Sequence, residues 1–95
     1  MESINRLRKR IDELDEQILL DLSKRVEISK SIGLQKRRQR IPIKDAPREN
    51  YVYTHIKKRA AVLGLDAVCI EEIFRQIVNM CTAVQELEEK STKIN

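Results

Sequence analysis

Two basic side chains in the first half of the chain have the spacing to bind one small anion together. Arg25 and Lys36 are eleven residues apart, so on an α-helix they project within about 20° of each other and lie about 16 Å apart along the axis. Both side chains are long enough to lean toward each other. Because an arginine holds a carboxylate in a fixed orientation and a lysine adds a point charge, the pair predicts a site for a small organic anion.

The same two cations belong to one face of a predicted helix on which residues recur every three or four positions. The register is Arg8, Ile11, Asp15, Ile18, Leu22, Arg25, Ser29, Ile32 and Lys36. Its apolar members predict a buried face. Burying unpaired cations costs roughly several kcal/mol each, and the register offers a single acid. A dicarboxylate ligand would neutralise the cations.

Arg8 lies on this face but about 25 Å from Arg25, too far for both to hold one small ligand from a single helix. We therefore expect Arg8 to come from a second copy of the chain. Further polar residues are expected at the same pocket: Arg48 and Glu49 open the next helix, and Gln85 lies one turn after Cys81 on a third. Taken singly, each of these residues also has an ordinary structural explanation, such as a surface ion pair or a helix start.

Three helices position these residues. There is no proline between Ser3 and Gln39, and the apolar periodicity predicts a first helix over about 3–39, ended by Pro42. Asp45 is expected to cap a second helix, about 46–63, with an apolar stripe of Val52, Ile56, Ala60 and Leu63.

Asp66 is expected to cap a third helix, about 66–89, followed by a polar tail at 90–95. Its inward residues are predicted to be Ile70, Ile73, Phe74, Ile77, Val78, Cys81 and Val84. The 95 residues thus form one all-α domain. No strand pattern or repeat is evident.

The first helix is too long for a globule of this size. It should measure about 54 Å, whereas 95 residues predict a diameter of a little over 30 Å. Its own two partner helices cannot cover it. The sequence therefore predicts an intertwined homodimeric helical bundle in which each chain covers the other's overhang.

Composition narrows the functional classes. The net charge of +4 is unevenly distributed, with +7 over residues 1–64 and −3 over residues 65–95. A nucleic-acid-binding helical dimer that uses Lys36 to Arg40 as a phosphate patch is left open. No apolar run reaches the roughly 20 residues that a membrane helix needs, and no signal-peptide core is present, so we expect a cytoplasmic protein with no membrane partner. The single histidine, His55, and two separated cysteines predict no metal site.

The chain resembles the all-helical (AroQ-class) chorismate mutases over about residues 5–89. The resemblance depends on LRKRID at 7–12, LDEQIL at 14–19, Arg25, Lys36, IPIKDAPRE at 41–49 and Gln85, in that order and at that spacing. It implies intertwined dimers that convert chorismate to prephenate on the route to phenylalanine and tyrosine, without a cofactor.

The resemblance also implies a role for each site residue. Arg8 of the second chain and Arg25 would each bind one substrate carboxylate. Lys36 and Gln85 would hydrogen-bond the ether oxygen of the breaking bond. Glu49, with the backbone at Asp45, would hold the ring hydroxyl, and Arg48 would add positive field.

One position departs from the family pattern, because Cys81 stands where some relatives have a carboxylate-binding serine. A thiol is a weaker donor, so we treat Cys81 as lining the pocket. Alternatives stay open at this point. An isochorismate pyruvate lyase has a similar fold and cationic pocket, and the nucleic-acid-binding dimer accounts for the basic run but not for inward-facing Arg8, Arg25 and Gln85. A plain coiled-coil module would have apolar residues in place of Arg25 and Lys36.

Overall fold

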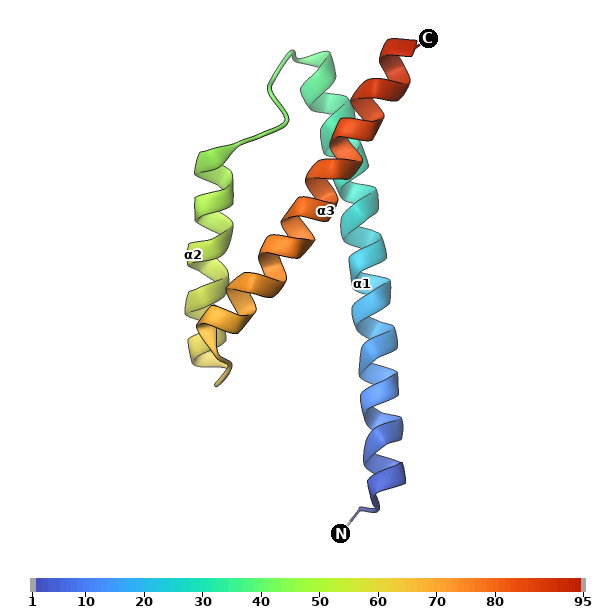
Figure 1. Ribbon diagram of the computed structural model, residues 1–95, viewed down its shortest axis with the longest axis vertical. Helices are drawn as coiled ribbons and strands as arrows, with labels where there is room; N and C mark the ends of the chain where they lie inside the picture. Colours follow the sequence, from blue (N-terminus) through green and yellow to red (C-terminus); the bar gives the residue numbers. More distant parts are fainter. Residues whose placement is uncertain (1, 95) are drawn as a thin grey trace.

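The chain forms three helices joined by two short connections (Figure 1). The computed structural model describes the backbone of residues 2–94 and the side chains of residues 2–87. The helices are α1 (Ile4–Arg38), α2 (Ala46–Val62) and α3 (Ala67–Ile94), and residues 2–94 contain no strand. The predicted all-α class with a very long first helix is confirmed.

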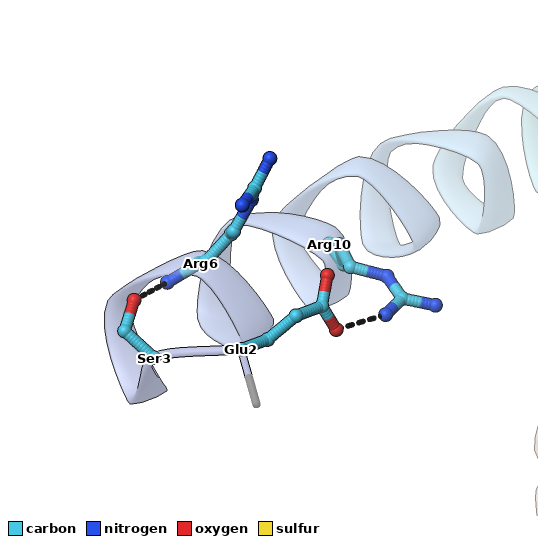
Figure 2. A network of polar contacts seen from close by, with 4 residues as sticks. All are labelled: Glu2, Ser3, Arg6 and Arg10. Atoms are coloured by element: carbon cyan, nitrogen blue, oxygen red, sulfur yellow. Dashed lines mark hydrogen bonds and ion pairs between the residues drawn. The ribbon is translucent and has the colours of Figure 1, made fainter.

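The first turn of α1 is closed by a side chain. The hydroxyl of Ser3 accepts a hydrogen bond from the backbone amide of Arg6 at 3.2 Å, which satisfies one of the amides that a helix start leaves free (Figure 2). Beside it, the Arg10 guanidinium donates to the Glu2 carboxylate (Figure 2). Both partners of this ion pair are exposed, so it contributes little to stability.

The end of α1 differs from the prediction, which made Pro42 the terminator. The helix ends at Arg38, and Arg40 adopts a left-handed conformation with φ 55°. The amide of Ile41 donates to the Lys36 carbonyl at 2.8 Å and that of Arg40 to the Arg37 carbonyl at 3.2 Å. This is a Schellman motif, so backbone hydrogen bonds end the helix before Pro42 is reached.

The starts of the other two helices agree with the prediction. The Asp45 carboxylate accepts from the Arg48 amide at 3.0 Å, and the Asp66 carboxylate accepts from the Cys69 amide at 2.9 Å. At its other end α2 closes with a second Schellman motif, in which Gly64 takes the left-handed position with φ 73°.

Three details of the prediction are wrong. In the single chain, Leu63 is 61% exposed at the C-cap of α2, and Ile73 is 54% exposed outside the face of α3 that meets the other helices. The tail at 90–95 was expected to be non-helical, but α3 continues to Ile94. Polarity alone does not stop a helix, and no glycine or proline follows Gly64. The side chains of the tail and residue 95 itself lie outside the described part of the chain.

Helix α3 joins the other two. It runs diagonally, packing its first half against α2 and its second half against the C-terminal half of α1, while the described residues of α1 and α2 do not contact each other (Figure 1). The molecule measures 59 × 28 × 15 Å, with a radius of gyration of 17.0 Å against the roughly 12 Å expected of a globule this long.

The hydrophobic core of the single chain is thin. Among the described side chains only Tyr53, Ala60, Val78 and Cys81 are buried apolar groups. In contrast, five large apolar residues on the first half of α1 are exposed, at alternating steps of three and four; this N-terminal stripe consists of Ile4, Leu7, Ile11, Leu14 and Ile18. A heptad pattern of this kind is typical of a helix face that packs on another helix.

Candidate active site

A cavity of about 410 Å³ lies where the C-terminal half of α1, the connection to α2, the start of α2 and the second half of α3 meet. Its size suits a small metabolite. Its polar lining comes from Arg25, Ser29, Lys36, Asp45, Arg48, Glu49, Cys81, Thr82 and Gln85, and its apolar lining from Ile28, Ile32, Ile43, Val52 and Val78.

Every residue predicted for the site lines this cavity except Arg8. Arg8 is exposed near the far end of α1, 17 positions before Arg25, which corresponds to about 25 Å of helix. The structure of one chain therefore brings together the residues expected from that chain and leaves Arg8 apart from them.

Lys36 is held between two oxygen acceptors. Its ammonium group donates to the Ile43 carbonyl at 2.6 Å and to the Gln85 side-chain oxygen at 3.1 Å. The first bond ties α1 to the connection that follows it, and the second ties α1 to α3. Because the Gln85 oxygen accepts from Lys36, its amide nitrogen keeps two hydrogens to donate to a ligand.

Gly33 allows Gln85 to approach α1 this closely. Gly33 is buried one turn before Lys36, and a Cβ added there would lie 3.1 Å from the Gln85 Cα and 3.2 Å from its Cβ and Cγ. A larger residue would push α3 away from α1. From sequence, Gly33 is only a weak point in a helix; its role depends on the tertiary approach and could not be predicted.

Arg25 is half-buried and faces α3. Its guanidinium donates to the Cys81 sulfur at 2.8 Å. Cys81 is buried, and it both lines the cavity and contacts Arg25. The contact sets Arg25 at the cavity wall with other guanidinium N–H groups still available to an anion.

The start of α2 contributes the third wall of the site. Asp45 uses its carboxylate to cap α2, and its carbonyl accepts from the Glu49 amide at 3.0 Å. Glu49 is half-buried, whereas Arg48 is exposed and lies over the ring of Tyr51, 5.0 Å from the ring centroid. This cation–π contact orients Arg48 at the pocket rim.

The charge of the cavity is not balanced by internal ion pairs. Within residues 2–87, none of the ion pairs involves Arg25, Lys36 or Arg48. Asp45 and Glu49 supply two carboxylates to the same lining. Three cations against two acids leave the site with an excess of positive charge that suits an anionic ligand.

The shifted pKa values lie outside the cavity, on the α2–α3 side. The pKa of Glu71 is lowered because Lys57 donates to it at 2.9 Å, with further help from Arg75. The pKa of Asp66 is lowered by the backbone amide of Cys69. The carboxylate of Asp66 in turn raises the pKa of the Cys69 thiol. These groups support the helix starts and the α2–α3 contact. No cluster of three or more potential metal ligands occurs among the described residues.

Two of the polar lining residues, Ser29 and Thr82, were not predicted from the sequence as site residues. Ser29 belongs to the predicted register of α1, but a serine between Arg25 and Lys36 gives no sign in the sequence that it binds anything. Thr82 follows Cys81 on α3 and has no signal of its own. Only the packing of α3 on α1 identifies them as part of the cavity.

Comparison with known proteins identifies the family. The model of the family described as chorismate mutase type II matches residues 7–86. The chain belongs to this family. The predicted resemblance is therefore confirmed.

Three relatives illustrate the match. A chorismate mutase of Methanocaldococcus jannaschii is 33% identical over 95 residues, covering 98% of this chain and 96% of that protein. A bifunctional chorismate mutase/prephenate dehydratase of Aquifex aeolicus is 32% identical over 88 residues, which cover 90% of this chain but 24% of the longer protein. A solved structure described as a conserved hypothetical protein from Pyrococcus furiosus is 36% identical and superposes with a TM-score of 0.70, covering 88% of this chain and 99% of that one.

For this member of the chorismate mutase type II family, the matched segment contains the whole cavity lining and also Arg8. The described helices include none with the combination of length and apolarity that crossing a membrane requires.

Proposed function

We propose that the protein is a chorismate mutase that rearranges chorismate to prephenate in the cavity between α1 and α3. The observation that carries the proposal is the convergence of Arg25, Lys36 and Gln85, from two helices, on one cavity whose cations have no acidic partner among the described residues. Membership of the family supports it. The product belongs to the route to phenylalanine and tyrosine, and we expect the enzyme to act in the cytoplasm.

The reaction needs positioning and charge stabilisation. In a Claisen rearrangement a carbon–oxygen bond breaks while a carbon–carbon bond forms, with no proton transfer and no cofactor required. A site promotes it by holding the flexible dianion in a compact shape and by placing donors where the ether oxygen gains negative charge. Arg25 suits the first task because its planar fork orients a carboxylate.

Lys36 and Gln85 suit the second task. The Lys36 ammonium donates to the Gln85 side-chain oxygen at 3.1 Å, which keeps the amide nitrogen of the same side chain close by, so both donors can address one oxygen atom. A donor preorganised in this way needs no rearrangement as charge develops. Glu49 and the Asp45 backbone would hold the ring hydroxyl, Arg48 would add positive field at the rim, and Cys81 would line the carboxylate end.

We propose that the second carboxylate is bound by Arg8 of a second copy, in an intertwined homodimer. Two observations support this arrangement. Arg8 is about 25 Å of helix away from Arg25, and the N-terminal stripe around it is exposed in the single chain. If the first helices of the two chains run antiparallel about a two-fold axis, a partner that covers the stripe would also bring its own Arg8 toward the Arg25 end of this cavity.

The test is an assay of the purified protein with chorismate. We expect chorismate absorbance to fall, with prephenate as the product, and no pyruvate release from isochorismate. Pyruvate release without prephenate would replace the proposal with the lyase. Salt-sensitive binding of mixed DNA by a protein inactive on both substrates would favour the nucleic-acid-binding alternative.

A further inference from the structure

Ser29 is one of only two buried polar side chains among residues 2–87, and both line the cavity. Ser29 is 5% exposed and Gln85 is 9% exposed. Gln85 accepts a hydrogen bond from Lys36. The Ser29 hydroxyl makes no hydrogen bond among the described residues, which is unusual for a buried polar group.

The orientation of this hydroxyl follows from two further observations. In the described part of the chain, every side-chain oxygen or nitrogen that is fully shielded from solvent has a hydrogen-bond partner. The Ser29 hydroxyl has no such partner, so its oxygen is not fully shielded and must be accessible from the cavity that Ser29 lines. A helical serine commonly donates to the carbonyl four residues earlier, and Ser31 does so to Glu27 at 3.4 Å. Ser29 makes no such bond.

Ser29 lies close to the carboxylate-binding end of the site. It is four residues after Arg25 on the same face of α1, a spacing at which helix side chains are neighbours. One turn later Gly33 meets Gln85, and one turn earlier Arg25 meets Cys81. Ser29 therefore lies on α1 between two of the places where α1 contacts α3.

We propose that Ser29 is a substrate-binding residue whose hydroxyl donates a hydrogen bond to the carboxylate held by Arg25. The proposal rests on the proposed function, because it takes the ligand to be a dianion. A carboxylate only accepts hydrogen bonds, so it needs donors around it. Cys81, on the opposite wall, offers only a weak S–H donor. Ser29 supplies a hydroxyl donor at the end of the pocket where α3 carries a thiol.

The test is Ser29→Ala, with Ser31→Ala as the matched control on the same helix. Loss of a hydrogen bond to a charged group should raise the KM for chorismate roughly tenfold or more. A uniform binding contact should change kcat much less. Ser31 is exposed and bonded to the backbone, so its variant should keep the wild-type KM.

Adding Cys81→Ser to Ser29→Ala places a hydroxyl on the opposite wall and should recover part of the lost affinity. A Ser29→Ala protein that folds and has a KM within twofold of wild type would overturn the proposal while leaving the mutase activity standing. A wild-type protein with no mutase activity would instead overturn the proposed function, and the role of Ser29 with it.

Discussion

The two halves of α1 belong to one continuous helix but have opposite environments. From Arg25 to Lys36 the helix packs on α3, encloses Ser29 and Gly33, and lines the cavity. From Ile4 to Leu20 every side chain is exposed, including the N-terminal stripe. The same 3-4 periodicity runs through both halves. Periodicity therefore predicts a buried face without saying which chain buries it.

The two halves of α1 therefore have different roles. The C-terminal half presents Arg25 and Lys36 to a cavity formed within one chain. We propose that the N-terminal half serves the partner chain, by assembly and by supplying Arg8. Changes in one half should alter turnover at constant assembly, and changes in the other should alter assembly first.

The largest effect should come from Lys36→Ala in the C-terminal half. Removing a preorganised donor to the developing charge costs about 3 to 4 kcal/mol, so kcat should fall by roughly 100- to 1000-fold. Light scattering should show an unchanged assembly. Arg38→Ala is the control, because Arg38 is exposed two residues away and does not line the cavity. Turnover near wild type in Lys36→Ala would remove Lys36 from the mechanism.

Next in size should be Ile11→Asp in the N-terminal stripe. A carboxylate buried without a partner in each copy should weaken association by roughly 100-fold or more, and activity should fall at low protein concentration. Analytical ultracentrifugation measures the dissociation constant. Lys9→Asp, which adds a carboxylate on the opposite face of the helix, is the control. If Ile11→Asp associated as tightly as wild type, the stripe would not be the interface.

Gly33→Ala should have an intermediate effect on the C-terminal half. Alanine favours the helix by about 1 kcal/mol, but its Cβ would lie 3.1 Å from the Gln85 Cα. Moving α3 by a few tenths of an ångström should separate Lys36 from Gln85 and lower kcat roughly tenfold, with a smaller change in KM. Steady-state kinetics measures the change in kcat, and thermal unfolding measures any change in stability separately. An unchanged kcat would show that the close approach is only packing.

The ends of α1 and α2 allow the smallest and finest test. Both close with a Schellman motif, but the left-handed residue is Arg40 in one and Gly64 in the other. Arg40→Gly should raise the free energy of unfolding by about 1 kcal/mol, and Gly64→Ala should lower it by a similar amount. A Cβ at Gly64 would have no atom within 4 Å, so backbone strain alone is measured. If denaturant titrations showed that the free energy of unfolding changes in the same direction in both variants, this explanation would be contradicted.

Local signals predicted most of the fold. Asp45 and Asp66 were readable as helix caps, and the apolar periodicity placed three helices. The end of α1 was not readable, because a left-handed arginine leaves no mark in sequence and Pro42 offered a plausible terminator. The exposure of Leu63 and Ile73 depends on which faces of α2 and α3 other helices cover, and this is a tertiary property.

The part of the site that depends on residue spacing along one helix could be predicted from the sequence. Eleven residues between Arg25 and Lys36 place both on one face. The positions of Glu49 and Gln85 on the other two helices led us to expect them at the same pocket, and the family resemblance implied their roles. The roles of Gly33 and Ser29 could not be predicted from the sequence. Gly33 acts through the close approach of α3 to α1, and Ser29 stands out only because its buried hydroxyl makes no hydrogen bond among the described residues.

The central claim, that each active site takes residues from two chains, is tested most directly by mixing two inactive variants. Arg8→Ala and Lys36→Ala protein, mixed in equal amounts and allowed to exchange subunits, should form hybrid dimers with one intact site each. Random pairing makes about half of the dimers hybrids, so activity should recover to about a quarter of wild type. Exchange verified by mass-tagged subunits without any recovery of activity would contradict a shared site.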